Sequence, residues 1–167
     1  MQTALLVIDM QVSLRADETP NPDEILPAVQ ALVAAARATG VDVIWITDSR
    51  VGPDGALVPD FVPQDGEVRI EKPACNAFEN TDLEAELTIL GVERLVVCGL
   101  QSDACIDGTV RGAVGNGFDV LLAADAHTSH GFEGRDWRGV IAQTNASLGS
   151  LERVTVLPSA DVFAAIG

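Results

Sequence analysis

The sequence predicts a three-layer α/β/α fold, in which helices cover both faces of a six-stranded parallel sheet in a Rossmann-like arrangement. Apolar segments of strand length alternate with amphipathic segments of helix length, as in successive βαβ units. The strand-length segments are apolar at nearly every position, which is typical of strands buried on both faces. With 167 residues and 47% hydrophobic content, the chain fits one domain over residues 1–167.

Six apolar segments rich in β-branched residues are the predicted strands. They cover residues 4–8, 41–46, 68–70, 94–98, 118–123 and 154–157. In an open parallel sheet, ligands bind at the carboxyl ends of the strands. The residues that follow these segments are therefore the first candidates for a functional site.

Five segments between and after the strands predict helices. They cover residues 23–39, 81–91, 105–116, 136–148 and 161–166. In the first, apolar residues recur at helical spacing up to Gly40, a residue that commonly ends a helix. Thr81 and Glu84 have the spacing of a capping box, in which each side chain satisfies the other's unpaired backbone amide.

One long loop is predicted from Arg50 to Gly66. It contains three prolines and three glycines and no periodic apolar pattern. We expect it to lie over the carboxyl ends of the first strands, where long loops often form a lid.

The charge balance narrows the range of partners. The chain has 25 acidic and 10 basic residues, for a formal charge of -15, and such a surface repels nucleic acid and anionic membranes. No apolar segment approaches the ~20 residues that span a bilayer. The three cysteines form no disulfide framework and the amino terminus has no secretion pattern, so we expect a cytoplasmic protein that acts on a small molecule.

Three chemically distinctive residues follow predicted strands. Asp9 ends the first strand, Lys72 follows the third, and Cys105 begins a predicted helix after the fourth. The positive end of the helix dipole at a helix amino terminus stabilises a thiolate, so the pKa of a cysteine there is lowered and its sulfur becomes more nucleophilic. A carboxylate can take the thiol proton, and an ammonium favours both anions.

Each of these residues also has a purely structural interpretation. Asp9 and Lys72 suit a surface ion pair or a loop cap, and cysteine is among the most buried residue types. Cys98, inside an apolar strand, is predicted to fill the core, and Cys75 to be structural. Local pattern alone leaves the role of Cys105 open.

Longer motifs favour the chemical interpretation. The chain reads ALLVIDMQ at residues 4–11, EKPACNAF at 71–78 followed by TDL at 81–83, LVVCGLQSDACI at 95–106 and GFDVLLAADA at 117–126. In these motifs it resembles the isochorismatase-like cysteine hydrolases, which include nicotinamidases, N-carbamoylsarcosine amidohydrolases and isochorismatases. The resemblance runs over nearly the whole chain.

The resemblance implies roles for particular residues. It implies a triad of Asp9, Lys72 and Cys105 on a six-stranded parallel sheet. It also implies a cis peptide bond between Leu100 and Gln101, with the amides of Gln101 and Cys105 forming an oxyanion hole. Substrate-pocket residues are predicted from their adjacency to the triad: Met10, Gln11, Asn76 and Phe78.

The chain departs from the nicotinamidases at their metal site. Those enzymes carry an Asp and several His residues after the second strand, where this chain reads ITDSR at residues 46–50. We therefore expect no metal and no cofactor. His127 and His130 supply too few ligands for another metal site, and we expect them in a loop or at a helix start.

The leading hypothesis is hydrolysis of a small amide or carbamoyl compound through a thioester on Cys105. One alternative is isochorismatase-type vinyl-ether hydrolysis with Asp9 as the acid, although members of that type usually lack the cysteine. Another is a catalytically silent binding member of the fold. The resemblance further implies a homo-oligomer, a dimer or a tetramer.

Overall fold

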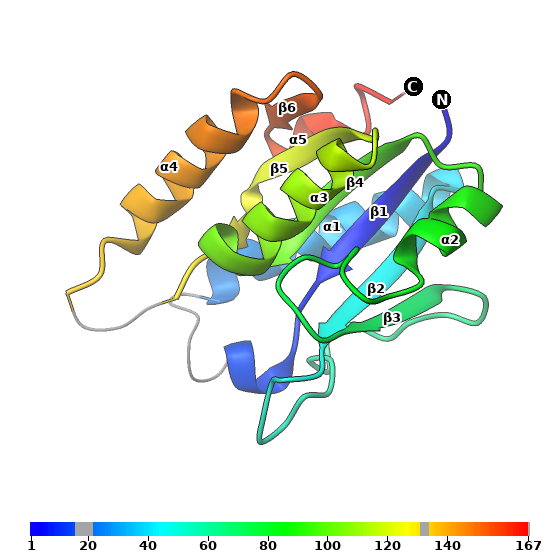
Figure 1. Cartoon of the computed structure of the whole chain (residues 1–167). Helices are drawn as coiled ribbons and strands as arrows, with labels where there is room; N and C mark the ends of the chain where they lie inside the picture. The colour runs from blue at the N-terminus through cyan, green and yellow to red at the C-terminus, as the bar shows by residue number, and fades with distance from the viewer. Residues whose placement is uncertain (16–21, 131–133, 167) are drawn as a thin grey trace.

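Six parallel strands form one sheet in the computed structural model, which describes residues 1–15, 22–130 and 134–166 (Figure 1). The strands are β1 (Thr3–Ile8), β2 (Asp42–Asp48), β3 (Val68–Lys72), β4 (Arg94–Leu100), β5 (Asp119–Thr128) and β6 (Val154–Leu157). Their order across the sheet is β3-β2-β1-β4-β5-β6, and every neighbouring pair is parallel. The predicted fold class is confirmed.

Helices cover both faces of this sheet. One face carries α1 (Pro22–Thr39) and α5 (Ser159–Val162), and the other carries α2 (Leu83–Ile89), α3 (Asp107–Gly115) and α4 (Trp137–Gly149), the three helices in front of the sheet in Figure 1. Alternate residues of β1 serve the two layers: Leu5 and Val7 pack with α1, whereas Leu6 and Ile8 pack with the opposite layer.

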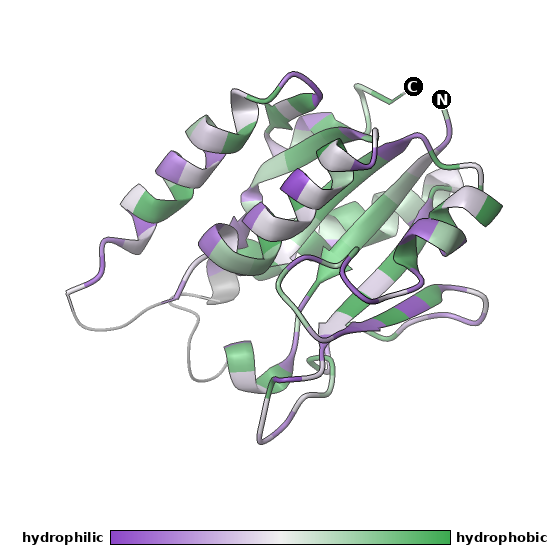
Figure 2. Ribbon diagram, in the orientation of Figure 1, coloured by the Kyte–Doolittle hydropathy of each residue, from purple (hydrophilic) through white to green (hydrophobic). Residues whose placement is uncertain are grey.

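The central strands are buried on both sides. Every residue of β1 is buried, and the last six of β4 are as well. Figure 2 shows these strands as a largely apolar layer between helices whose outer faces are polar. Within the described ranges, no helix is both long and apolar enough to cross a bilayer.

Several element boundaries differ from the predictions. The predicted capping box is wrong. Asp82 precedes α2, and its side chain makes no cap hydrogen bond. The Thr81 hydroxyl donates to the carbonyl of Ala77 and accepts from the amide of Leu83. The threonine lies one residue too early, so its hydroxyl stabilises the preceding turn. The last helix begins directly after Pro158 and is shorter than predicted.

Strand β5 is longer than its apolar segment. It continues through polar residues as far as Thr128, and its pairing with β4 shifts register between Val97 and Gly99. Because of this irregularity, His127 pairs with Gly99 and belongs to a strand. The prediction that placed His127 in a loop or at a helix start is therefore wrong.

The long loop is fastened to the segment that follows β1. The amides of Val12 and Ser13 donate to the carbonyls of Ala56 and Asp54, and the amide of Val58 donates to the carbonyl of Met10. Val58 is itself buried in the core. The loop thus lies beside the carboxyl ends of the first strands, as predicted.

Candidate active site

The sheet reverses its strand order between β1 and β4, and the candidate site lies at the carboxyl ends of these strands. In open α/β sheets, such a switch point is where ligands bind. Asp9 follows β1, and its backbone has φ 51°, in the left-handed region that aspartate enters more readily than most residues. After β4, Gln101 leads into a π-helical turn, η2 (Ser102–Ile106), which carries Cys105 and continues into α3.

The three predicted triad residues lie together. Lys72 Nζ is 2.8 Å from Asp9 Oδ2 and 3.1 Å from Cys105 Sγ. The side chains of Asp9 and Lys72 are fully buried, and Cys105 is 8% exposed. The peptide bond between Leu100 and Gln101 is cis, as the resemblance implied. Side chains from β1, β3 and the turn after β4 therefore meet in one buried cluster.

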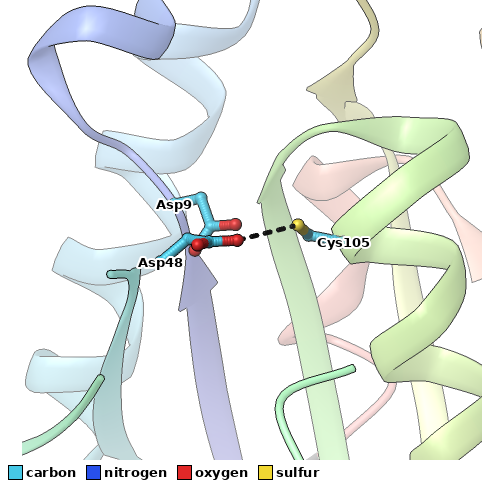
Figure 3. A group of neighbouring side chains, drawn as sticks. All are labelled: Asp9, Asp48 and Cys105. Atoms are coloured by element: carbon cyan, nitrogen blue, oxygen red, sulfur yellow. Dashed lines mark hydrogen bonds between the residues drawn. The ribbon is translucent and has the colours of Figure 1, made fainter. Parts of the chain in front are cut away.

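A fourth member of the cluster, Asp48, was missed in the sequence. Its Oδ2 lies 3.0 Å from Lys72 Nζ and 3.9 Å from Cys105 Sγ, and Figure 3 shows it beside Asp9 and facing the sulfur. The predicted second strand stopped at Ile46, two residues before Asp48, so Asp48 was not considered among the residues at strand ends. Asp48 is a polar residue at the carboxyl end of β2, the same signal that indicated Asp9 and Lys72.

Asp48 is held by its neighbours on several sides. Arg50 donates to both of its carboxylate oxygens, from Nε at 2.9 Å and from Nη2 at 2.6 Å. Gln11 holds its backbone, because the Gln11 Oε1 accepts from the Asp48 amide and Nε2 donates to the Asp48 carbonyl. Gln11 was predicted to line the substrate pocket, but its side chain instead holds the backbone of Asp48.

Burial and charge set the protonation of this cluster. Burial raises the pKa of the Asp9 carboxyl to about 6, although Lys72 and Cys105 act to lower it. Burial acts to lower the pKa of Lys72, but the interactions with Asp9 and Cys105 together outweigh that effect, and the net shift is upward. Burial likewise opposes ionisation of Asp48, and its hydrogen bonds with Arg50 and Lys72 more than compensate and lower its pKa.

The resting state of Cys105 differs from the expectation. Burial, followed by the nearby negative charge of Asp9, raises the pKa of the thiol, whereas the helix amino terminus was expected to lower it. Lys72 opposes this shift without reversing it. The raised pKa favours the neutral thiol, so the sulfur would need a base to become a nucleophile.

Asp9 is a candidate for this base, since its carboxylate lies within 4.8 Å of the sulfur. Although Asp9 pairs with Lys72, neither of its oxygens accepts a well-directed hydrogen bond from the described residues. A buried carboxylate with spare acceptor positions and a pKa near 6 can take a proton from an adjacent thiol.

A cavity of about 350 Å³ opens onto the cluster. Its lining includes Asp9, Asp48, Arg50, Gln101 and Cys105. The sulfur is therefore reachable, which a core-filling cysteine such as the fully buried Cys98 is not. A volume of this size suits a small molecule.

The cavity lining differs from the predicted pocket. Met10, Gln11, Asn76 and Phe78 are not among the described residues that form it. Met10 is buried in the core, Asn76 accepts from the amide of Phe78, and the Phe78 ring packs against that of Phe118. Adjacency in sequence failed as a guide here, because successive residues of a turning chain point in different directions.

Two residues that were predicted to have no part in the pocket, Cys75 and His130, line the cavity instead. Cys75 is half-buried there, with Arg50 Nη2 3.6 Å from its sulfur. His130 also lines the cavity. His127 is fully enclosed behind it: Nδ1 lies 2.8 Å from Ser102 Oγ and Nε2 lies 2.9 Å from Asn145 Oδ1.

The cluster does not fit a metal ion. The ligand atoms of Asp9, Asp48 and Cys105 lie within 4.8 Å of one another, a spacing at which such groups can bind a cation. Lys72 Nζ, however, lies within 3.1 Å of an atom of each of them. The ammonium supplies the positive charge that these groups need and repels a second cation.

Comparisons with known proteins agree with this architecture. The sequence model of the Isochorismatase domain matches residues 3–149. The chain belongs to the isochorismatase family. This isochorismatase-family chain is similar to a putative family hydrolase of known structure from Chromobacterium violaceum, with 33% identity and a TM-score of 0.86 over 99% of this chain and 94% of the other.

Curated relatives of this isochorismatase-family chain include named hydrolases. An uncharacterized family protein from Bacillus subtilis is 36% identical over 75% of this chain and 77% of its own. The N-carbamoylsarcosine amidase of Arthrobacter is 34% identical over 62% of this chain and 49% of its own, and a streptothricin hydrolase of Streptomyces noursei is 31% identical over 76% and 54%. The match thus spans about half the length of these two enzymes.

Proposed function

We propose that this chain is a cysteine-dependent hydrolase of a small amide or carbamoyl compound, and that it works through a thioester on Cys105. The observation that carries the proposal is the contact of one cavity-lining sulfur with a lysine that also pairs with a buried carboxylate. Similarity to enzymes named as an N-carbamoylsarcosine amidase and a streptothricin hydrolase supports C–N bond cleavage. A cavity of about 350 Å³ supports a small substrate.

Acylation begins with the neutral thiol. As the substrate carbonyl approaches, Asp9 takes the proton of Cys105, and the sulfur forms a bond to the carbonyl carbon. Lys72 stabilises the thiolate character of the sulfur from 3.1 Å. Negative charge that builds on the carbonyl oxygen is assigned to the backbone amides of Gln101 and Cys105.

The same proton then serves the leaving group. Protonated Asp9 donates it to the amide nitrogen as the C–N bond breaks, so that ammonia or an amine departs and a thioester remains. Water attacks the thioester, again losing its proton to Asp9, and the acid product leaves with the thiol restored. Lys72 stays charged throughout, because two carboxylates hold it.

The two rival functions make different demands on Cys105. Vinyl-ether hydrolysis also needs an acid like Asp9, whose pKa of about 6 would suit the role, but it makes no use of the sulfur. A silent binding protein needs neither group. The thioester route gives a role to a sulfur that lines the cavity and contacts Lys72, which favours it over the two alternatives.

Removal of the sulfur tests the proposal. A panel of primary amides, carbamoyl amines and isochorismate is screened for release of ammonia or acid, and Cys105→Ala and Cys105→Ser are compared on any substrate found. We expect both variants to lose at least about a thousandfold in kcat, the scale of a lost covalent nucleophile. Mass spectrometry of the quenched wild type should reveal an acyl adduct on the peptide that contains Cys105.

Cys98→Ala is the matched control, because it removes a thiol that is buried in β4 away from the cavity. It should retain most of the activity. Full turnover by Cys105→Ala would exclude the thioester route, and release of acid from isochorismate by that variant would support the vinyl-ether alternative.

A further inference from the structure

The most exposed charged side chain among the described residues of the cavity lining is a cation, although the protein carries a formal charge of -15. The two carboxylates of the lining are almost wholly buried: the Asp9 side chain is 0% exposed and the Asp48 side chain 5%. The Arg50 side chain, which pairs with Asp48, is 54% exposed. Among the described residues of the lining, Arg50 alone carries a permanent positive charge.

The guanidinium of Arg50 is also fixed in orientation. Asp48 engages its Nε and Nη2, and the Arg50 backbone amide donates to the same carboxylate at 2.9 Å. A cation held in this way loses little conformational freedom when it binds a ligand. Nη2 also lies 3.6 Å from Cys75 Sγ, whereas Nη1 makes no hydrogen bond with the described residues, and the side chain is 54% exposed where it lines the cavity.

This cation lies close to the nucleophile. Cys105 Sγ is 3.9 Å from Asp48 Oδ2, and the same oxygen is 2.6 Å from Arg50 Nη2. The sulfur and the guanidinium are therefore separated by no more than these two distances together. A carboxylate bound to Arg50 would lie only a few bonds from a carbonyl carbon that is in contact with the sulfur.

We infer that Arg50 is a specificity-determining residue that binds a carboxylate on the substrate, so that the substrate class is short amides or carbamoyl compounds bearing a carboxylate. This inference rests on the proposed function for its reaction. The recognition itself is independent of that reaction, because a charged guanidinium selects carboxylates whether or not hydrolysis follows.

Alkylation of Cys105 tests the recognition without any substrate. With either iodoacetate or iodoacetamide, the thiol sulfur displaces iodide from the methylene carbon, and the thiol proton passes to a base. The two reagents differ only in that iodoacetate has a carboxylate where iodoacetamide has an amide. The rate ratio of iodoacetate to iodoacetamide at Cys105 is measured by mass spectrometry and divided by the same ratio for glutathione. We expect a normalised ratio of about ten or more, the size of a single charge-assisted contact.

Three variants show where the preference comes from. Arg50→Gln should bring the normalised ratio to about one or below. Arg50→Lys, which keeps the charge without the two-point contact with Asp48, should retain part of it. Arg153→Gln is the matched control, because this exposed arginine pairs with Asp119 at the opposite edge of the strands, and it should leave the ratio unchanged.

Hydrolysis of succinamate and of butanamide, in which a methyl group replaces the carboxylate, separates the two proposals. Preference for succinamate that Arg50→Gln removes supports both. A preference in alkylation with no amide hydrolysed supports the recognition and counts against the proposed hydrolysis. A wild-type ratio at or below that of glutathione, an unreactive Cys105, or equal hydrolysis of both amides would overturn the role of Arg50.

Discussion

At the residue scale, the site is a balance of two carboxylates against two cations. Asp9 and Asp48 both contact Lys72, and Arg50 covers the outer side of Asp48. Because the two acids have different surroundings, their pKa values move in opposite directions, upward for Asp9 and downward for Asp48. In the proposed mechanism, this divergence suits Asp9 to proton transfer and keeps Asp48 charged.

The fall of kcat/KM at low pH should therefore reflect protonation of Asp9. Asp9 accepts a proton only when it is ionised, so kcat/KM should fall as the pH drops through about 6, the pKa to which burial raises it. The negative charge of Asp48 contributes to this raised pKa. In Asp48→Asn the fall should thus occur at lower pH, and kcat should decrease about tenfold or more because Lys72 and Arg50 lose a charged partner.

Asp119→Asn provides a comparison that removes one exposed carboxylate far from the cavity. This substitution should not change the pH at which kcat/KM falls on the acid side (the acid limb of the profile). If Asp48→Asn loses activity with an unchanged acid limb, Asp48 has a structural role only and does not act on Asp9 electrostatically.

At the element scale, neighbouring elements hold the turn that carries Cys105. Asn145 in α4 donates its amide to the carbonyl of Ala124, so its Oδ1 accepts from His127 Nε2, and Nδ1 is left to accept from Ser102 in η2. Burial lowers the pKa of His127, which keeps this arrangement neutral. Polar groups from β5 and α4 thus fix the turn that carries Cys105.

The pairing of β1 with β4 sets the distance between Asp9 and that turn. Gly99 has φ +117°, and a Cβ there would collide with the carbonyl oxygen of Ile8 and lie 2.8 Å from its amide nitrogen. Gly99→Ala should lower the free energy of unfolding by more than about 3 kcal/mol, because backbone atoms cannot move aside as a flexible side chain can. Urea unfolding followed by circular dichroism measures the loss.

Gly115→Ala is the comparison for this change. Gly115 ends α3, has no positive φ, and has open space where the Cβ would lie. The substitution should change stability by less than about 1 kcal/mol, in the stabilising direction. Equal effects of the two substitutions would mean that the close approach of β1 and β4 does not restrict residue 99.

At the scale of the whole molecule, the dominant feature is an excess of acidic residues. A formal charge of -15 on 167 residues produces repulsion that is greatest in the compact folded state. The fixed ion pairs of the site are buried, so salt affects the surface more than the cluster.

Moderate salt should therefore stabilise the fold. Raising KCl from about 10 mM to about 200 mM shortens the range of the repulsion, and the free energy of unfolding in urea should rise by about 1 kcal/mol. Near pH 4.2, where the net charge approaches zero, the same salt change should have little effect. A salt response equal at both pH values would show that net charge is not its cause.

The sequence by itself determined the layered fold and three members of the site. Strands such as β1 and β4 are buried on both faces, so runs of consecutive apolar residues identify them in the sequence. Asp9, Lys72 and Cys105 are recognisable because they follow such runs, where the sequence becomes polar. The triad could also be anticipated from the family motifs around it.

Only the tertiary structure decided which other groups join them and where the protons reside. Asp48 enters through the alignment of β2 with β3, His127 is enclosed by the register shift in β5, and Arg50 supplies the exposed charge of the cavity. Whether Cys105 is a thiol or a thiolate depends on burial and on charges contributed by β1 and β3. Desolvation and Coulomb interactions act across space, so residues distant in the chain set them and no local pattern reveals them.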